Sequence, residues 1–422
     1  MDIDQLYQIY LQHPEICTDS RKIVHGCLFF ALKGDAFDGN QFAVSALHTG
    51  ASYAIVDDIT LASVERCIIV DDVLSCLQKL ASFHRKQLNI PVLGITGSNG
   101  KTTTKELCRD VLQKKYITKA TLGNLNNHIG VPLTILSTKS DIEFLIVEMG
   151  ANHQGEIGFL CEIAHPGFVG ITNIGKAHLD GFGGEDGIKK GKSEIYKYAF
   201  GNQGFIFLNT EDNVLGSLIP VGSKIISYSL SDLIQVTKEE PLLSFKYRGI
   251  DVDTQLFGSY NIPNIGFAIA VGEYFGVETR EIASAIASYT PDNNRSQVVK
   301  SGTNIIIKDA YNANPSSMKL SIESFYKMEA KNKMLVLGDM LELGEFTVKE
   351  HKSIIELTKR LGFRNIIFVG PHFYETKDDE HGKYFTSIDD AKKYIHHFTV
   401  NDTLVLLKGS RGIGVEKILS EL

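Results

Sequence analysis

At 422 residues the chain is long enough for two to four domains, at roughly 100–200 residues each. Hydrophobic residues make up 43% and charged residues 22%, proportions typical of a soluble globular protein. A net charge of −7 and the lack of a Lys/Arg cluster argue against nucleic-acid binding, and no apolar run is long enough to span a bilayer. Without a signal-peptide pattern, we expect a cytoplasmic protein. Six cysteines without a CxxC pair favour reduced core thiols over zinc or disulfides.

The first 88 residues contain short apolar segments typical of strands at 27–32, 53–58 and 67–72. A helix is predicted at 73–88. The sequence NIPV at 89–92 begins a new element and predicts a domain boundary near Asn89.

Strands and helices alternate from residue 92 onward. Strands are predicted at 92–96, 144–150, 169–174 and 205–209, and helices at 101–114, 154–163 and 187–199. This alternation of apolar strands with helices predicts a mainly parallel sheet covered by helices on both faces. A polar, β-rich stretch to about 258 and two helices, at 261–275 and 280–289, complete this part.

The segment TPDNNRSQ at 290–297 predicts a linker, because Pro, Asp and tandem Asn do not readily continue a helix. The alternation then resumes, with strands at 304–310, 333–339, 365–370 and 403–410 and helices at 315–329, 347–361, 388–397 and 412–421. We therefore predict an α/β protein of three domains, at 1–88, 89–291 and 292–422.

Residues 94–106, GITGSNGKTTTKE, lie between a predicted buried strand and a predicted helix. Glycines there let backbone N–H groups turn inward around an anion at a helix N-terminus. Lys101 could reach the outer phosphates and the Thr102 hydroxyl could ligate Mg²⁺. Only two residues separate Gly97 and Gly100, where the usual P-loop has four. A glycine-rich turn with a chance GKT is therefore the alternative interpretation.

Polar residues follow several predicted strands, at the edge where ligands collect in open α/β sheets. Glu148 follows FLIV and is suited to Mg²⁺ that bridges phosphates. Asp309 could accept hydrogen bonds from ribose hydroxyls, and Asp339, Lys408 and Arg411 follow two more strands. Each of these residues alone could instead cap a helix or form a salt bridge. Together, at one edge of a sheet, they indicate a ligand site.

Two further residues have only ordinary interpretations from the pattern alone. His178 follows the predicted strand 169–174 in a glycine-rich loop, where a hydrogen-bonding surface histidine is the commoner case. Lys192, in GKSEIYKY, is typical of a solvated helix lysine.

A family resemblance rests on eight stretches, in chain order GSNGKTTTKE, GNLNNHIGVPLT, VEMGANHQGEI, ITNIGKAHLDGFG, GKSEI, DAYNANPSSM, LGDMLELGE and KGSRG. They resemble the Mur ligase family of peptidoglycan synthesis, most of all the branch that joins D-alanyl-D-alanine to UDP-N-acetylmuramoyl-tripeptide. The resemblance runs from TDSR at 18–21 to KGSRG and is most specific in YNANP with LGDMLELGE. It accounts for the short P-loop, because TGxNGKT is the family's form.

The resemblance implies an N-terminal UDP-substrate domain, a central P-loop domain that binds ATP and a C-terminal Rossmann-like domain that binds the dipeptide. It implies a monomeric, ADP-forming peptide ligase with an acyl-phosphate intermediate and no nucleic-acid or integral membrane partner. The residues implied for ATP are Gly97, Ser98, Asn99, Gly100, Lys101, Thr102, Thr103, Asn264, Arg295 and Asp309. Of these, Asn264 would meet adenine and Asp309 the ribose. Arg295 would meet the γ-phosphate, although the family often has Gly before this arginine and this chain has NNRSQ.

Two Mg²⁺ ions are also implied by the resemblance. Thr102 and Glu148 would hold the first, and His178 would hold the second beside a carbamoylated Lys192. Carbamate formation needs a neutral amine, and therefore a lysine whose pKa is lowered by burial or nearby cations. Lys101, Lys192 and His178 would be catalytic. The substrate residues implied are Ser20 and Arg21 for the uridine diphosphate, Asn126 and Asn127, and Asn312 and Asn314 for the dipeptide.

Alternatives stay open at this point. A sibling ligase that adds the third residue and folylpolyglutamate synthase share the general plan, although the DNPR-like stretch of the diaminopimelate-adding sibling is absent from the sequence. A nucleotide-dependent switch that hydrolyses ATP without ligation is a different class of function. Lysine and diaminopimelate both stay open as the third residue of the acceptor, because that selectivity depends on pocket shape.

Overall fold

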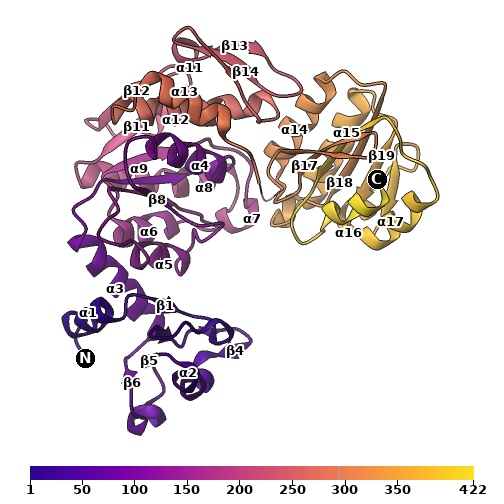
Figure 1. The fold of residues 1–422 in the computed structure, drawn as a ribbon. Coiled ribbons are helices and arrows are strands. Elements are labelled where there is room, and N and C mark those ends of the chain that lie inside the picture. Colours follow the sequence, from indigo (N-terminus) through magenta and orange to yellow (C-terminus); the bar gives the residue numbers. More distant parts are fainter. Residues whose placement is uncertain (293) are drawn as a thin grey trace.

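The computed structural model describes residues 1–292 and 294–422, so Asn293 of the predicted linker lies outside the described residues. The chain forms three successive α/β units, each built around its own sheet (Figure 1). The N-terminal unit lies below the central unit in this view, and the C-terminal unit lies beside it. The predicted α/β class with parallel sheets is confirmed, and the boundaries at 88/89 and 291/292 stay a prediction.

The N-terminal unit has a small parallel sheet in the order β1-β2-β5-β6. Its strands are β1 (Ile16–Cys17), β2 (Leu28–Phe30), β5 (Tyr53–Val56) and β6 (Cys67–Ile69). Its helices are α1 (Ile3–Gln12), α2 (Ala43–Thr49) and α3 (Val73–Gln87). A short hairpin pairs β3 (Lys33–Gly34) with β4 (Phe37–Asp38).

The central unit has an all-parallel sheet in the order β12-β11-β10-β7-β9-β8. Its strands are β7 (Val92–Thr96), β8 (Thr118–Ala120), β9 (Phe144–Glu148), β10 (Phe168–Ile171), β11 (Phe205–Asn209) and β12 (Lys224–Tyr228). Strands β8 and β9 lie on one side of β7, and β10 lies on its other side. A crevice is therefore expected at the carboxyl end of β7, where the strand order reverses.

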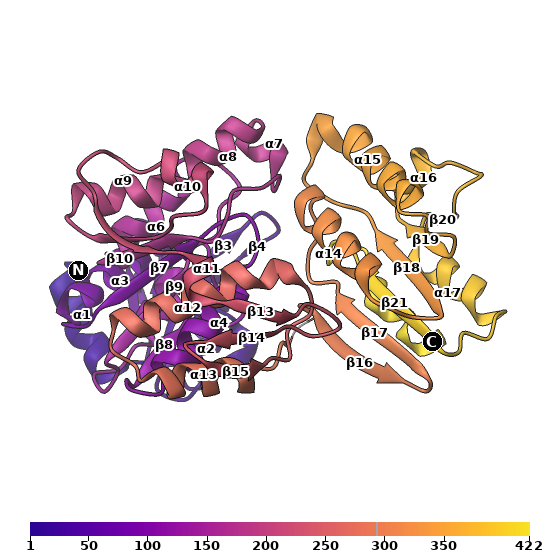
Figure 2. The same cartoon turned by 90° about the horizontal axis from the view of Figure 1, so that it is seen from above.

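Helices cover both faces of this sheet (Figure 2). The helices of the central unit are α4 (Lys101–Leu112), α5 (Gly130–Leu136), α6 (Glu156–Ala164), α7 (Leu179–Phe182), α8 (Glu185–Lys192), α9 (Glu194–Gly201), α10 (Asn213–Ser217), α11 (Leu230–Leu233), α12 (Ile262–Tyr274) and α13 (Thr279–Ser288). The single helix predicted at 187–199 is wrong, because α8 and α9 are separate helices that meet at Ser193. The Ser193 hydroxyl donates to the carbonyl of Lys190 at 3.0 Å, a local bond that competes with the helical pattern.

Close packing of α12 on the sheet depends on one glycine. Gly170 lies in β10, and a Cβ there would lie 2.2 Å from Cε2 of Phe267. Any side chain would push α12 away from the strand, so this position favours glycine for space. Phe267 belongs to an apolar core that also includes Leu107 of α4 and Ile95 of β7. This packing fixes α4 against the sheet, directly after the P-loop.

A small antiparallel sheet extends from the central unit toward the C-terminal unit. Its strands are β13 (Gln235–Lys238), β14 (Ser244–Tyr247) and β15 (Ile250–Asp253). The loop between β13 and β14 reaches α14 of the C-terminal unit, where Glu239 pairs with Lys327 at 2.9 Å. This arm therefore adds a contact between the two units that is separate from the linker.

The same loop buries a carboxyl group that has no hydrogen-bond partner among the described residues, that of Glu240. Burial raises the pKa of Glu240 from 4.5 to about 7, against the attraction of Lys327. Between these two values the folded chain keeps a proton that the unfolded chain has lost, so the free energy of unfolding falls as pH rises. The destabilisation caused by ionising the buried Glu240 carboxyl reaches its full value above about pH 7.

We therefore expect Glu240→Gln to stabilise the protein at pH 8 by about 1 kcal/mol, with allowance for solvent screening of a partly buried group. The gain should vanish near pH 4.5, where both states are protonated. Melting temperatures at several pH values measure the effect. Glu239→Gln is the control, since it removes an exposed ion pair and should change stability by less than about 1 kcal/mol. A Glu240→Gln gain that does not depend on pH would contradict this account.

The C-terminal unit has a sheet in the order β16-β17-β21-β18-β19-β20, parallel except for β16. Its strands are β16 (Gln297–Ser301), β17 (Asn304–Asp309), β18 (Asn332–Gly338), β19 (Ile366–Val369), β20 (Lys383–Phe385) and β21 (Thr403–Lys408). Its helices are α14 (Pro315–Lys327), α15 (Thr347–Arg360), α16 (Pro371–Glu375) and α17 (Ile388–His396). The helix predicted at 412–421 is shorter in the structure and is not an α-helix. A 3₁₀ helix at Val415–Glu421 follows Gly414, whose φ is +69°.

The junction between the first two units is packed rather than loose. Helix α3 lies against α5 and α6. Arg85 of α3 donates to the carbonyls of Ala164 at 2.9 Å and His165 at 3.2 Å, at the end of α6. It also donates to the carbonyl of Leu88 at 2.8 Å. No helix among the described residues is long and apolar enough to cross a membrane.

Candidate active site

A cavity of about 520 Å³ lies between the central and C-terminal units. It is bordered by the carboxyl ends of β9, β17 and β21 and by the loop after β7. The predicted site residues that line it are Ser98, Asn99, Gly100, Lys101, Thr102, Thr103, Asn126, Asn127, Glu148, His178, Asn264, Arg295, Asp309, Asn312 and Asn314. The structure therefore brings together residues that are up to about 200 positions apart in the sequence.

The P-loop is held by the loop that follows β10. Gly97 has a φ of +145°, and a Cβ there would lie 2.0 Å from Oγ1 of Thr172. Ser98 Oγ donates to the carbonyl of Gly175 at 2.8 Å. The Asn99 backbone N–H donates to Oδ1 of Asn173 at 3.0 Å. These bonds set the loop at the N-terminus of α4, where backbone N–H groups favour an anion.

Lys101 begins α4 and points back over the loop. Its Nζ donates to the carbonyls of Gly97 at 2.8 Å and Ser98 at 3.3 Å. Burial lowers the pKa of Lys101, against the attraction of Glu148. The amine therefore lies among the groups that a bound phosphate would contact.

Glu148 ends β9 and is almost fully buried. Its carboxylate accepts from Oγ1 of Thr102 at 2.9 Å and from Nδ2 of Asn126 at 2.8 Å. Nζ of the buried Lys105 lies 3.7 Å from the same carboxylate. Hydroxyl and carboxylate oxygens thus meet at one point beside Lys101, an arrangement suited to a hard cation.

Lys192 lies at the end of α8 and is only 1% exposed, so the interpretation as a solvated helix lysine is wrong. Its Nζ donates to the carbonyl of Ala151 at 3.3 Å and lies 5.0 Å from the centre of the Phe182 ring. Burial lowers the pKa of Lys192 well below its ordinary value, and the nearby Lys101 adds to this effect. This side chain is therefore a candidate for a neutral amine.

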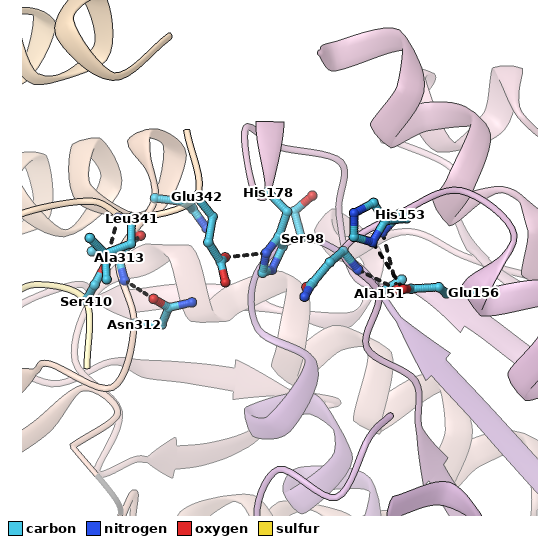
Figure 3. Close-up of polar contacts among 12 residues, drawn as sticks. Ser98, Ala151, His153, Glu156, His178, Asn312, Ala313, Leu341, Glu342 and Ser410 are labelled. Atoms are coloured by element: carbon cyan, nitrogen blue, oxygen red, sulfur yellow. Dashed lines mark hydrogen bonds and ion pairs between the residues drawn. The ribbon is translucent and has the colours of Figure 1, made fainter. Parts of the chain in front are cut away.

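His178 faces the C-terminal unit across the cavity (Figure 3). It has a φ of +53°, and its Nδ1 contacts a carboxylate oxygen of Glu342. This contact lowers the pKa of Glu342. Figure 3 shows Glu342 and Asn312 approaching from the C-terminal side, opposite His178 and Ser98.

Asn264 holds the far side of the P-loop. Its Oδ1 accepts from Oγ1 of Thr104 at 3.1 Å, and its Nδ2 donates to Oδ1 of Asn261 at 2.9 Å. A Cβ on Gly100 would lie 2.4 Å from Oδ1 of Asn264. The asparagine is therefore fixed directly against the turn of the loop.

Asp309 and Arg295 come from the C-terminal side of the cavity. Asp309 accepts from Nζ of Lys408 at 2.6 Å and from the backbone N–H of Ser296 at 3.3 Å. The Arg295 guanidinium lies 3.6 Å from the centre of the Tyr311 ring, in stacking position. The end of the linker is thus attached to the strand edge of the C-terminal sheet.

Asn314 bridges the two units. Its Oδ1 caps α14 by accepting from the Ser317 N–H at 2.9 Å, and its Nδ2 donates to Oδ1 of Asn99 at 2.7 Å. Asn312 Oδ1 accepts from the N–H of Ala313 at 2.9 Å. A separate cross-unit ion pair joins Lys176 to Glu350 at 2.7 Å.

Besides Lys192, five predicted residues do not line the cavity: Gly97, Ser20, Arg21, Asp339 and Arg411. The Asp339 carboxylate instead accepts from the backbone N–H groups of His372 and Phe373 in α16, both at 2.8 Å. Gly97 is the first glycine of the P-loop and packs against Thr172. Ser20 and Arg21 are in a short 3₁₀ helix of the N-terminal unit, Ser20–Lys22. Arg21 is exposed and pairs with Asp19 at 2.8 Å. The proposed grip on uridine diphosphate would therefore be in a different unit from the ATP site.

Three family models match successive parts of the chain. The Mur ligase family catalytic domain matches residues 14–92, the Mur ligase middle domain 95–272, and the glutamate ligase domain of Mur ligases 294–411. The chain is 33% identical to UDP-N-acetylmuramoyl-tripeptide–D-alanyl-D-alanine ligase of Bacillus subtilis, over 96% of this chain and 92% of that protein. Its identity to the ligase of that name from Escherichia coli is 32%, over 96% and 93%.

The chain belongs to the Mur ligase family.

Solved structures agree with this assignment. A crystal structure of MurF from Acinetobacter baumannii superposes with a TM-score of 0.88 at 29% identity, covering 100% of this chain and 98% of that one. MurF ligase from Thermotoga maritima, in complex with ADP, gives a TM-score of 0.86 at 27% identity, covering 97% of each chain.

Sequence reasoning missed several residues of this Mur ligase site. Lys105 is four positions after Lys101 in GKTTTK, and residues four apart lie on the same face of a helix. This spacing could have predicted that Lys105 lies near Glu148, as it does at 3.7 Å. Tyr311 is part of the motif YNANP, but stacking with Arg295 depends on the path of the linker. Glu342 is part of LGDMLELGE, yet nothing in that stretch indicates a partner 164 positions away.

Proposed function

We propose that the protein is an ATP-dependent, ADP-forming ligase that joins D-alanyl-D-alanine to UDP-N-acetylmuramoyl-tripeptide in peptidoglycan precursor synthesis. The strongest support is that the P-loop and the YNANP motif line one cavity, while Glu342 of LGDMLELGE contacts His178 at its edge. The family relatives whose names state this reaction align over more than nine-tenths of both chains.

In the first step, a carboxylate oxygen of the tripeptide attacks the γ-phosphorus of ATP. The bond from that phosphorus to the bridging oxygen breaks, which yields an acyl phosphate and ADP. Lys101 and the N-terminal amides of α4 bind the phosphates and offset their charge. Arg295 adds a positive charge from the linker, while Asn264 and Asp309 hold adenine and ribose.

In the second step, the amine of D-alanyl-D-alanine attacks the acyl carbon and loses a proton, and phosphate leaves with the electrons of the broken C–O bond. Asn312 and Asn314 are the proposed dipeptide contacts on the C-terminal side. The proposed contacts to the UDP-linked acceptor are Ser20, Arg21, Asn126 and Asn127. A cavity enclosed by two units aligns the reactants and excludes water, which would otherwise hydrolyse the acyl phosphate.

Two Mg²⁺ ions and a carbamoylated Lys192 are part of the proposal, which is supported by the contact of Thr102 with Glu148 and by the burial of Lys192. Thr102 and Glu148 would hold one ion, and His178 with the carbamate of Lys192 the other. When bound, the ions neutralise charge on the transferring phosphoryl group. Burial lowers the pKa of the Lys192 amine, which favours the neutral form that reacts with CO₂. The described residues include no cluster of three His, Cys, Asp or Glu side chains that could hold a metal ion. In this proposal the Thr102 hydroxyl, the carbamate and the nucleotide phosphates would therefore supply the other oxygens.

The test is an ATP-dependent ligation assay across paired acceptors and amines, with products identified by mass. We expect a product equal in mass to the two substrates less one water, formed only with ATP and D-alanyl-D-alanine. Coupling of a single amino acid instead would favour the sibling that adds the third residue. An ATPase rate that neither substrate changes would favour a nucleotide-dependent switch.

The same assay decides between the two acceptors left open by the sequence. UDP-N-acetylmuramoyl-tripeptides that end in lysine and in diaminopimelate are compared by kcat/KM. A monomeric state and a cytoplasmic location remain predictions.

A further inference from the structure

Glu342 reaches His178 from the opposite side of the active-site cavity. It follows β18, in the loop before the 3₁₀ helix Gly344–Phe346, whereas His178 immediately precedes α7 of the central unit. Its carboxylate contacts Nδ1 of His178, and its carbonyl accepts from the N–H of Asp180 at 3.4 Å. Figure 3 shows this pair spanning the space between the two units.

Both residues have a backbone conformation that is uncommon outside glycine. The φ of His178 is +53° and that of Glu342 is +64°. Such conformations cost of order 1 kcal/mol or more and persist where the surroundings hold them. Here Gly344, two positions after Glu342, contributes, because it packs so closely on Asp180 that a Cβ would lie 2.3 Å from Oδ1 of Asp180. The two loops therefore present the two side chains to each other.

The ion pair itself is a weak source of stability. The Glu342 side chain is 52% exposed, and exposed pairs contribute about 0–1 kcal/mol. A less exposed ion pair joins the same two units nearby, because Glu350, whose side chain is 6% exposed, pairs with Lys176 at 2.7 Å. The Lys176–Glu350 pair therefore contributes more to holding the two units together than the Glu342–His178 pair.

We propose that Glu342 is a positioning residue, supplied by the C-terminal unit, that orients the His178 ring through Nδ1 and leaves Nε2 as the nitrogen that binds the metal. This inference rests on the proposed function. A metal-binding histidine commonly has its other ring nitrogen fixed by a carboxylate, which sets the tautomer and the ring angle. No described residue bonds to Nε2 of His178, so that nitrogen is available.

A consequence is that the second metal site is complete only while the two units are in contact. His178 belongs to the unit that carries the P-loop, and Glu342 to the unit that carries YNANP. Contact of the C-terminal unit, which carries the proposed dipeptide site, with the central unit would therefore orient His178 in the site where the phosphoryl group is transferred. The metal site would sense whether both halves of the active site are assembled.

The test uses Mn²⁺ as a spectroscopic probe, titrated by electron paramagnetic resonance against the full chain with a non-hydrolysable ATP analogue. We expect Glu342→Ala to weaken the second Mn²⁺ by about 10- to 100-fold, the range for loss of such a carboxylate. Glu342→Gln keeps an acceptor for Nδ1–H and should lose about threefold or less. In ligation assays kcat should fall in the same order, with KM for ATP unchanged.

Two further variants separate positioning from structural damage. Glu342→Gly removes the side chain but suits the left-handed backbone, so it should match the alanine variant rather than the wild type. Lys176→Ala removes the stronger cross-unit pair without touching the His178 ring, and it should keep the second Mn²⁺ within about twofold.

Wild-type Mn²⁺ affinity in the alanine and glycine variants would overturn the inference. Equal weakening by Lys176→Ala would do so as well, since it would assign the effect to contact between the units. Failure of the proposed function looks different, because the wild type would then form no ligated product while the Mn²⁺ titrations could still separate Glu342 from Lys176.

Discussion

Lys192→Ala is expected to lower kcat for ligation by about 10²–10³, the range seen when one preorganised charge-stabilising group is removed. Lys192 lies almost fully buried under Phe182, with its amine on the carbonyl of Ala151. Alanine removes the only proposed carbamate, and with it an anionic ligand of the second ion. Initial rates of product formation, followed by mass, measure the loss.

Two controls isolate the carbamate. Lys190→Ala removes an exposed lysine from the same helix and should keep full activity. Lys192→Arg keeps a positive charge, but a guanidinium stays protonated and forms no carbamate, so its rate should fall as far as that of the alanine variant. Depletion of CO₂ and bicarbonate should slow the wild type reversibly and leave Lys192→Ala unchanged. An alanine variant with full activity in bicarbonate-free buffer would refute the carbamate role.

Glu148→Gln should reduce kcat/KM by a comparable factor, about 10² or more, and raise the Mg²⁺ concentration needed for half-maximal rate. The amide has the shape of the carboxylate, so its oxygen can still accept from Asn126 and its NH₂ can donate to the Thr102 hydroxyl, while the negative charge is lost. Lys105, 3.7 Å away, then has no anion on that side, which further disfavours a cation. The effect should therefore appear in metal dependence more than in folding.

Rates measured against Mg²⁺ concentration, together with melting temperature, test this. Glu162→Gln is the matched control, an exposed glutamate on α6 of the same unit, and should behave like the wild type. Normal turnover at ordinary Mg²⁺ by the Glu148 variant would remove the proposed metal site. A large fall in melting temperature would instead identify Glu148 as mainly structural.

The parts of the fold that were predictable from sequence are those with local signals. The strand at 92–96 and the strand at 205–209 have the predicted bounds, because each is an apolar run with clear ends. The P-loop was recognisable from GSNGKTTT, since glycines, lysine and hydroxyls must be adjacent in sequence to hold a phosphate.

The parts that were missed depend on contacts between distant segments. The edge strands β8 and β20 have only three residues each, and β16 begins at the end of the predicted linker, so their pairing is set by neighbouring strands rather than by their own pattern. The burial of Lys192 comes from Phe182 and from the chain at Ala151, so helical periodicity alone gave the wrong exposure. The pairing of His178 with Glu342 arises only when two units meet.

Because α3 is completed by packing on α5 and α6, the order of synthesis constrains how the protein matures. When the ribosome has released residues 1–88, it must still synthesise the chain up to residue 164 before α5 and α6 can pack on α3. At about 5–20 residues per second, this synthesis takes several seconds. The nascent first unit must therefore wait with an apolar helix face open. That interval is when a holding chaperone would be of most use.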